Sequence, residues 1–403
     1  MSHRTVVTGV SMINALGLRT GEVFDRLYQG VSGARMIQGF DASSLPTRFA
    51  CEMAEGFDEA YAPLQSSVVG RFGGLSARFG HYTTQMLLDD YPVDWSRVDR
   101  RRVGIILGVS FSFEYWDGIS STTLYQMMPS SVPALIAQQY DWRGNHQVVA
   151  TACASGADAI AKAARLVEAG ELDMVFAGGS DRNVIMPTLE GFNAVLALSE
   201  WNHAPEKASR PFDKDRNGFV IGDGAGICLI ESLEHARSRG APILCELKGY
   251  SSTSEAANIV APKEGGVGMM DTMRKALRKA DMEPSRIDYI NAHGTATNQN
   301  DRCEALAIKD VFADRYPLVS SSKSMIGHCI CAAGGIEAVI SVLSLVQGRI
   351  PPTINHDEPE EDWADLDFVP KVGREVPIES VLSNSFAFGG HNCSLIFTKT
   401  DDL

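Results

Sequence analysis

The stretch Val148–Gly156, with the sequence VVATACASG, passes from β-forming residues through a single cysteine into small residues, and the following segment, 157–169, is rich in alanine. An apolar strand that leads into an alanine-rich helix is typical of a buried central element in an α/β fold. Cys153 therefore lies where a helix begins, where exposed N–H groups lower the pKa of a thiol and can hold an oxyanion. The alternative is a small buried cysteine that only fills a tight turn.

A second copy of this pattern occurs in the C-terminal part of the chain. Gly170 follows the glycine of Cys153-Ala154-Ser155-Gly156 by fourteen residues, and Gly348 follows the glycine of Cys331-Ala332-Ala333-Gly334 by the same interval. Each intervening segment is an apolar helix that ends at glycine, the residue that a left-handed helix cap favours. The spacing predicts two copies of one α/β unit whose central helices pack back to back.

The hydrophobic pattern along the chain alternates between short strands and helices without a Pro-rich or Ser-rich linker. The acidic run 357–367 is interpreted as a solvated loop. We expect strands at 5–10, 102–108, 173–177, 219–221, 226–231, 243–249, 288–291, 317–319, 381–385 and 393–398, and helices at 21–29, 75–89, 132–140, 188–196, 232–239, 267–280, 301–312 and 332–347.

Composition excludes several classes of protein. The net charge of −14 over 403 residues argues against a nucleic-acid-binding protein, which must neutralise phosphates. No run of about 18 consecutive apolar residues indicates a membrane span. The eight cysteines are dispersed and lack the paired spacing of a structural zinc site, so we expect free thiols, a cytoplasmic location and no metal.

Three further stretches place polar residues at strand ends, where α/β folds build their sites. They are Asn291–Thr297 (NAHGTAT), Ser322–His328 (SKSMIGH) and Asn384–Asn392 (NSFAFGGHN). A thiolate that reacts with thioesters needs imidazoles to move protons and to stabilise an enolate, and these stretches supply two histidines and a lysine. Taken singly, each histidine has a structural alternative, and Lys323 has the alternative of a surface amine.

The four motifs TACASG, NAHGTAT, SKSMIGH and NSFAFGG, in this order, resemble those of the elongating β-ketoacyl-acyl carrier protein synthases. The resemblance extends to Thr5–Gly9, Ala208–Asp213, Gly218–Gly226 and Pro351–Asn355. It implies the thiolase fold, a five-layered αβαβα arrangement with two pseudo-repeated halves. The first half, 1–245, would carry the nucleophilic cysteine and a cap or dimer insertion, and the second, 246–403, the two histidines and the lysine.

The resemblance also implies roles for individual residues. Cys153, His293 and His328 form the catalytic set, which separates the chain from initiating synthases and from thiolases. No metal or diffusible cofactor is expected. Lys323 and Glu337 support the histidines. The N–H groups of Cys153 and Phe388 form the oxyanion hole, and Phe388 is also the gate. The substrate-binding residues are Thr295 and Thr297 at the pantetheine arm, Phe192 in the acyl tunnel and Phe386, and Arg71 belongs to a carrier-protein patch.

The family's FGFGGTN turn appears here as Phe386–Asn392, with Ala387 replacing a glycine and His391 replacing a threonine. Because alanine lacks the conformational freedom of glycine, the first replacement predicts a stiffer gate. The second adds a titratable group near the site. Cys331, the repeat counterpart of Cys153, is expected only to pack.

The implied activity is the decarboxylative condensation of an enzyme-bound acyl chain with malonyl-carrier protein in type II fatty-acid elongation. A ketosynthase subunit of a type II polyketide synthase, paired with a chain-length factor, is the alternative, and 129–133 and 297–302 look closer to that class. A non-catalytic chain-length factor is a third class, although such subunits lack the nucleophile. Acyl carrier protein is the expected partner, and the chain is expected to form a homodimer or that heterodimer.

Overall fold

The computed structural model describes residues 3–110 and 121–400. Within these residues one large sheet passes through the whole molecule, and two short two-stranded sheets lie beside it. The large sheet contains β1 (Thr5–Asn14), β4 (Val103–Gly108), β5 (His146–Val149), β6 (Met174–Asp181), β7 (Gly224–Ser232), β8 (Cys245–Ser254), β9 (Tyr289–Asn291), β10 (Leu318–Ser320), β13 (Ser380–Phe386) and β14 (His391–Thr398), and the small sheets β2 (Arg35–Met36) with β3 (Phe49–Ala50) and β11 (Arg349–Ile350) with β12 (Arg374–Glu375).

The predicted helices are all present, with bounds that differ by three residues or fewer, and the described part of the chain also contains four short helices, at 57–61, 68–72, 123–127 and 323–326, that were not predicted. The helices are α1 (Thr20–Tyr28), α2 (Phe57–Tyr61), α3 (Val68–Phe72), α4 (Leu75–Asp90), α5 (Thr123–Met127), α6 (Ser131–Tyr140), α7 (Ser155–Glu168), α8 (Met186–Ala194), α9 (Leu233–Arg239), α10 (Val267–Ala280), α11 (Asn298–Val311), α12 (Lys323–Ile326) and α13 (Ala333–Gln347).

The strand order, β10-β9-β13-β14-β8-β1-β7-β6-β4-β5, confirms the predicted duplication. In the first half, β7 pairs antiparallel with β1 and β6, while β4 pairs parallel with β6 and β5. In the second half, β14 pairs antiparallel with β8 and β13, while β9 pairs parallel with β13 and β10. The halves join where Val6 and Val7 of β1 pair with Glu246 and Cys245 of β8.

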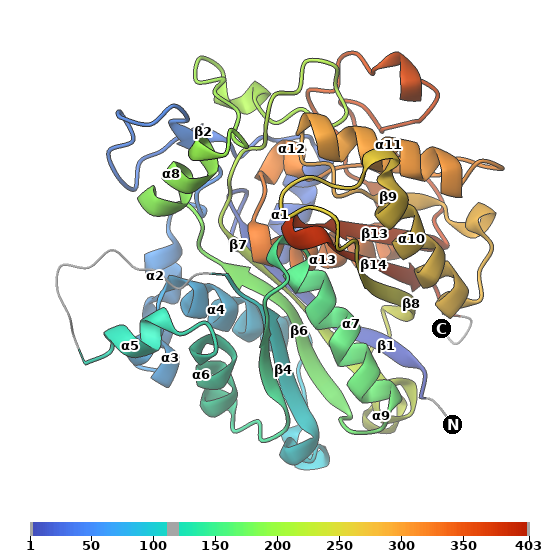
Figure 1. Cartoon of the computed structure of the whole chain (residues 1–403). Helices are drawn as coiled ribbons and strands as arrows, with labels where there is room; N and C mark the ends of the chain where they lie inside the picture. The colour runs from blue at the N-terminus through green and yellow to red at the C-terminus, as the bar shows by residue number, and fades with distance from the viewer. Residues whose placement is uncertain (1–2, 111–120, 401–403) are drawn as a thin grey trace.

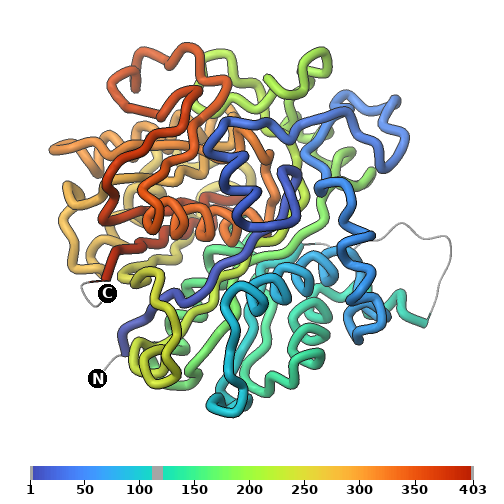
Figure 2. Tube along the Cα trace, turned by 180° about the vertical axis from the view of Figure 1, so that it is seen from behind, coloured from blue at the N-terminus to red at the C-terminus, as the bar shows by residue number. Residues whose placement is uncertain are grey.

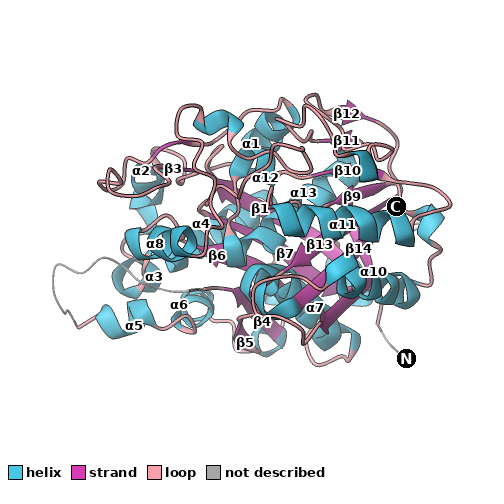
Figure 3. Ribbon diagram, turned by 45° about the horizontal axis from the view of Figure 1, so that its top comes forward, coloured by secondary structure: helices cyan, strands magenta, loops and turns pink. Residues whose placement is uncertain are grey.

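Helices cover both faces of each half and give five layers. Helices α7 and α13 contact each other between the two halves, α4 and α6 pack on the outer face of the first half, and α10 packs on that of the second beside α11. Figure 1 shows α7 running diagonally between α4 and α6 on one side and α10 and α11 on the other. Figure 3 shows the strands of the large sheet in the interior, with helices around them. Figure 2 shows both ends of the chain on the same side of the molecule.

The helix α13 belongs to the core. The segment Ile330–Gln347 is long and apolar enough to cross a membrane by composition, but 89% of it is buried inside the protein. It packs with α7 in the largest hydrophobic cluster, together with side chains of β1, β7, β8 and β14. Its apolar character is therefore that of a central helix in a layered α/β protein.

Glycines allow the first turns of α7 and α13 to approach within backbone contact. A Cβ atom on Gly335 would lie 2.4 Å from the carbonyl oxygen of Gly226 and 2.5 Å from the backbone nitrogen of Gly179. A Cβ atom on Gly156 would lie 2.6 Å from the nitrogen of Gly335. Side chains here would separate the two halves. At the other end, Gly170 and Gly348 have φ values of 71° and 67°, as the predicted left-handed caps require.

Two sequence-based expectations are wrong. Residues 219–221 form isolated bridges rather than a strand, because Phe219 and Ile221 pair with single residues of two different loops. The acidic run 357–367 is not merely solvated, since Trp363 within it is fully buried. Its carboxylates form ion pairs that fasten it to the surrounding elements: Asp357–Lys371, Glu358–Lys214, Glu360–Arg216, Asp362–Arg302, Asp365–Lys309 and Asp367–Arg374.

We predict that Gly335→Ala destabilises the protein by about 1–3 kcal/mol, because the added methyl group overpacks a contact between backbones. Gly191→Ala is the matched control, since it also lies in a helix but nothing lies within 4 Å of its added Cβ atom. Denaturant unfolding of both variants measures the difference. Equal stability of the two variants would contradict the proposed contact between the halves.

Candidate active site

Cys153 lies on a sharp turn between β5 and α7. The turn is a short 3₁₀ segment, Ala152–Ala154, in which Ala152 has a φ of 49°, a region that residues other than glycine rarely adopt. Ser155 stabilises it, because its Oγ accepts a hydrogen bond from Thr151 N (2.9 Å) and donates to Ala152 O (2.7 Å). The sequence repeat is matched here, since Ile330 has a φ of 45° in the corresponding turn before α13.

The expected lowering of the Cys153 pKa is wrong for the unliganded site. Burial raises the pKa of this thiol to about 11, and it outweighs the positive charge of Lys323 and the backbone N–H groups of Phe388 and Cys153, which act in the opposite direction. The residue is only 8% exposed, so desolvation of the charged form dominates. The Cys153 side chain is a neutral thiol at neutral pH, and the two N–H groups at its sulfur are those predicted to form an oxyanion hole.

His293 follows β9 and is held from its backbone. Glu304 of α11 accepts hydrogen bonds from His293 N (2.9 Å) and Gly294 N (2.8 Å). Lys323 donates to the carbonyl oxygen of His293 (2.6 Å) and lies with its Nζ 3.3 Å from Nδ1 of the ring, while forming a buried ion pair with Glu337. Because an ammonium group only donates, Nδ1 accepts and the ring proton lies on Nε2.

His328 follows α12 and approaches the same point from another loop. Its backbone N donates to Val220 O (2.7 Å), and its ring lies 5.3 Å from that of His293, centroid to centroid, at 85° between the planes. Neither ring nitrogen has a hydrogen-bond partner among the described residues. Buried polar atoms are normally paired, so these nitrogens are free to bind a substrate atom.

The structure brings Cys153, His293 and His328 together, with one sulfur or nitrogen atom from each lying within 4.8 Å of the others. All three are buried and line one cavity of about 340 Å³. Burial lowers the pKa of both histidines well below the usual value, and the charge of Lys323 adds to this effect, so both imidazoles are neutral at physiological pH. Neutral imidazoles can donate a hydrogen bond to a developing negative charge.

The donor set of one thiol and two imidazoles resembles a zinc site in its atom types. However, the ammonium of Lys323 lies 3.3 Å from Nδ1 of His293 and opposes a dication at this place. The chemistry that the arrangement supports is nucleophilic attack by sulfur with stabilisation of an oxyanion, which needs no metal.

The predicted gate, Phe388, belongs to the lining of the same cavity. Its ring centroid is 6.5 Å from that of Phe192. Ala387 has a φ of −131°, which any residue adopts, so alanine fits this turn without strain, and the stiffer gate stays a prediction. The positive φ values fall on Gly389 and Gly390 instead. His391 is half-buried and faces Ser254 across the strand pair.

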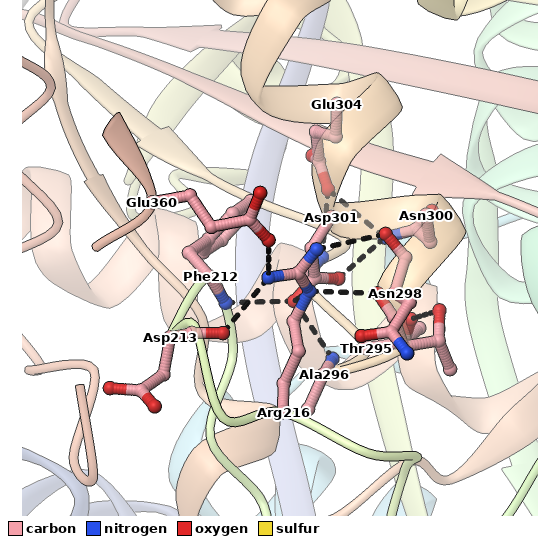
Figure 4. Close-up of polar contacts among 12 residues, drawn as sticks. Phe212, Asp213, Arg216, Thr295, Ala296, Asn298, Asn300, Asp301, Glu304 and Glu360 are labelled. Atoms are coloured by element: carbon pink, nitrogen blue, oxygen red, sulfur yellow. Dashed lines mark hydrogen bonds and ion pairs between the residues drawn. The ribbon is translucent and has the colours of Figure 1, made fainter. Parts of the chain in front are cut away.

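Thr295 and Thr297 lie on the cavity wall and contact each other through their hydroxyl groups, 2.9 Å apart. Ala296 between them has a φ of 66°, and its N–H donates to Asp301 of α11 (3.1 Å). Figure 4 shows this turn held between α11 and the loop that carries Arg216. Phe386 also lines the cavity, as predicted.

Two carboxylates behind the site escape sequence analysis. Asp301 and Glu304 are fully buried, and burial raises the pKa of Glu304 to about 7. They occupy the same face of α11 as the buried Ala305 and Ile308. A pair of carboxylates on the apolar stripe of a helix is the signal that would have revealed them, because charged groups are buried only where partners satisfy them.

Three predicted residues lie outside the cavity lining. Lys323 and Glu337 form the buried ion pair behind His293. Arg71 is exposed at the end of α3, where its guanidinium lies 5.3 Å from the centroid of the Phe72 ring. Cys331 is buried, and its sulfur lies 3.3 Å from Ser155 Oγ, which agrees with a packing role.

Comparison with known proteins matches the two halves of the chain separately. Residues 2–236 match the family described as "Beta-ketoacyl synthase, N-terminal domain", and residues 244–357 match "Beta-ketoacyl synthase, C-terminal domain". The chain is 38% identical over 415 residues to 3-oxoacyl-[acyl-carrier-protein] synthase 2 of Coxiella burnetii, covering 99% of each chain.

Solved structures agree over the whole length. The ishigamide ketosynthase/chain length factor has a TM-score of 0.88 and 31% identity, covering 99% of this chain and 100% of that one. A ketosynthase complex described as a type II PKS acyl-carrier protein with its ketosynthase bound to the hexaketide has a TM-score of 0.88 and 28% identity, covering 100% of both chains. The fold is the thiolase fold that the sequence motifs predicted, and the chain belongs to the β-ketoacyl synthase family.

Proposed function

We propose that this protein is a 3-oxoacyl-[acyl-carrier-protein] synthase of type II fatty-acid elongation, and that Cys153, His293 and His328 perform its chemistry. The observation that carries the proposal is the meeting of one thiol and two neutral imidazoles at a single cavity. The full-length relative named 3-oxoacyl-[acyl-carrier-protein] synthase 2 supports the choice of substrate.

In the first half-reaction the sulfur of Cys153 attacks the carbonyl of an acyl thioester. The thiol proton passes to the leaving thiol of the carrier arm, and the acyl chain stays on Cys153. The N–H groups of Cys153 and Phe388, which face the sulfur, hold the oxyanion of the tetrahedral intermediate. Phe192 and Phe386, on the cavity wall, contact the acyl chain.

In the second half-reaction malonyl-carrier protein loses carbon dioxide, and the electron pair of the broken bond forms a thioester enolate. His293 and His328 donate hydrogen bonds to the enolate oxygen. The enolate carbon attacks the acyl carbonyl on Cys153, and the sulfur leaves as a thiolate that takes up a proton from solvent and becomes the neutral thiol again. The 3-oxoacyl chain, two carbons longer, leaves on the carrier protein. Lys323, paired with Glu337, keeps the proton of His293 on Nε2.

Other parts of the proposal concern organisation and partners. We infer two halves, 1–245 and 246–403. The strands from β8 onward repeat the topology of the first half, and β8 begins at Cys245. The eight cysteines are free, which supports a cytoplasmic location. Acyl carrier protein is the partner, and Thr295 and Thr297 bind its pantetheine arm. The exposed Arg71 belongs to the surface on which the carrier protein docks, because an acidic carrier requires local positive charge there.

The second candidate function is a ketosynthase subunit of a type II polyketide synthase that works with a chain-length factor. The ketosynthase structures in complex with a carrier protein and with a chain-length factor support it. The presence of the complete Cys-His-His set opposes a third possibility, that this chain is itself the non-catalytic partner.

Replacing the nucleophile tests the enzyme directly. We predict that Cys153→Ala lowers condensation by at least about a thousandfold and abolishes the mass increase that acyl-carrier protein causes in the intact protein. Cys303→Ser is the matched control, because its thiol is buried outside the cavity lining. Full activity of Cys153→Ala would show that Cys153 is not the nucleophile, whereas wild-type protein that neither condenses nor becomes acylated would favour a non-catalytic subunit.

The pH dependence of Cys153 follows from its burial. A thiol with a pKa of about 11 is protonated at neutral pH, so its thiolate fraction rises with pH. We predict that alkylation of Cys153 by iodoacetamide accelerates about tenfold per unit between pH 7 and 9. Intact-protein mass spectrometry measures the rate, with Cys153→Ser as the blank. A plateau reached below pH 8 would show that the thiol is already ionised.

The oligomeric state separates the two candidate functions. We predict that the protein expressed alone forms a stable homodimer that condenses acyl and malonyl groups. Light scattering coupled to size-exclusion chromatography, followed by the condensation assay, tests both parts. Aggregation or inactivity that only a second ketosynthase-like chain corrects would favour the polyketide subunit.

A further inference from the structure

Arg216 is a buried cation that lies next to the cavity without lining it. Its side chain is 2% exposed, and it comes from the loop after Phe212 in the first half of the chain. Most arginines are solvated because a buried charge requires partners on all sides. Here the partners come mainly from the second half, as Figure 4 shows.

The guanidinium donates hydrogen bonds to the backbone of the threonine turn and of its own loop. Its Nε donates to Thr297 O (3.2 Å), its Nη2 to Asn298 O (2.9 Å), and its Nη1 to Asp213 O (2.9 Å). Thr297 is one of the two threonines on the cavity wall, and Asn298 begins α11 and also lines the cavity. One side chain thus fastens the end of the threonine turn to the opposite half of the molecule.

Carboxylates on two sides hold the guanidinium in place. Asp301, fully buried, has an oxygen 3.9 Å from Nε, and it also accepts hydrogen bonds from Ala296 N and Phe212 N (2.8 Å). Glu360 of the acidic run forms an ion pair with Nη1. The ring of Trp363, whose centroid is 5.2 Å from the guanidinium carbon, covers another side.

These contacts hold the backbone of Ala296 in an unfavourable conformation. Ala296 has a φ of 66°, a conformation that costs energy for a residue with a side chain and persists only where the surroundings enforce it. Gly218 N donates to Ala296 O (3.0 Å), so the loop of Arg216 holds the turn at its middle residue as well as at its end. The spacing of the Thr295 and Thr297 hydroxyl groups depends on this conformation.

We propose that Arg216 is a positioning residue for the carrier arm, acting through the Thr295–Thr297 turn, and that Glu360 orients it. The proposal rests on the proposed function, in which these threonines bind the pantetheine amides. Arg216 makes no contact with the reacting atoms. Its loss therefore weakens recognition of the arm and leaves the chemistry at Cys153 in place.

The test is Arg216→Lys, which keeps the charge but cannot donate to three carbonyl oxygens in a plane. We expect KM for malonyl-carrier protein to rise about tenfold, which corresponds to the loss of one or two hydrogen bonds between the threonine turn and the carrier arm. We expect kcat to change less than twofold. KM for a malonyl thioester of a simple alkyl thiol, which has no amide groups, should not change. Glu360→Gln should show the same selectivity with a smaller effect.

Two comparisons distinguish this role from a general loss of structure. Lys214→Met is the matched control, because Lys214 lies on the same loop and pairs with Glu358 of the same acidic run, but is 46% exposed. It should leave both KM values unchanged. Combining Arg216→Lys with Thr297→Val should raise KM by less than the product of the two single effects, because residues that act through the same turn are not additive.

Equal changes of KM for both thioesters, no change for either, or additive effects in the double variant would overturn the inference. Acylation of Cys153 in Arg216→Lys, followed by intact mass, and its thermal unfolding show whether the enzyme is folded and competent. Wild-type protein that forms no acyl-enzyme would overturn the proposed function and this inference together, whereas equal effects on both thioesters overturn only the inference.

Discussion

The backbone contact between the first turns of α7 and α13 is the constraint on which the rest of the structure depends. Gly156 and Gly335 allow these turns to touch, and the turns lie where the two repeated halves meet. Cys153 immediately precedes α7, while His328 lies shortly before α13 and His293 follows a strand of the second half. Neither half contains the complete site, so the chemistry exists only because the halves approach this closely.

The second constraint is electrostatic and follows from the first. Cys153, His293 and His328 are buried where the two halves meet, and desolvation keeps both the thiol and the imidazoles neutral at rest. The buried charges lie one layer further back, where Lys323 and Glu337 neutralise each other and Glu304 binds the backbone of His293. This separation keeps hydrogen-bond donors directed at the cavity while the charges stabilise the loops that carry them.

The pairing of charges also accounts for the structure of the acidic run 357–367. Composition favoured a solvated loop, yet its carboxylates pair with cations from three other parts of the chain, and Trp363 anchors it. Exposed ion pairs contribute little stability individually. The Glu360–Arg216 pair differs because the guanidinium is buried, and there a partner on each side is a requirement of folding.

By itself the sequence determined the α/β class, the duplication, most element positions and the identity of the chemical groups, because periodicity, glycine caps and motif order are local properties. Only the tertiary structure decided that the Cys153 thiol is neutral, that Ala387 fits its turn without strain, and that Arg216, Asp301 and Glu304 hold the site from behind. The physical reason is that a pKa or a buried ion pair depends on desolvation and on partners distant in the chain. No local pattern records these, since residues 216, 301 and 360 meet only after the two halves have packed.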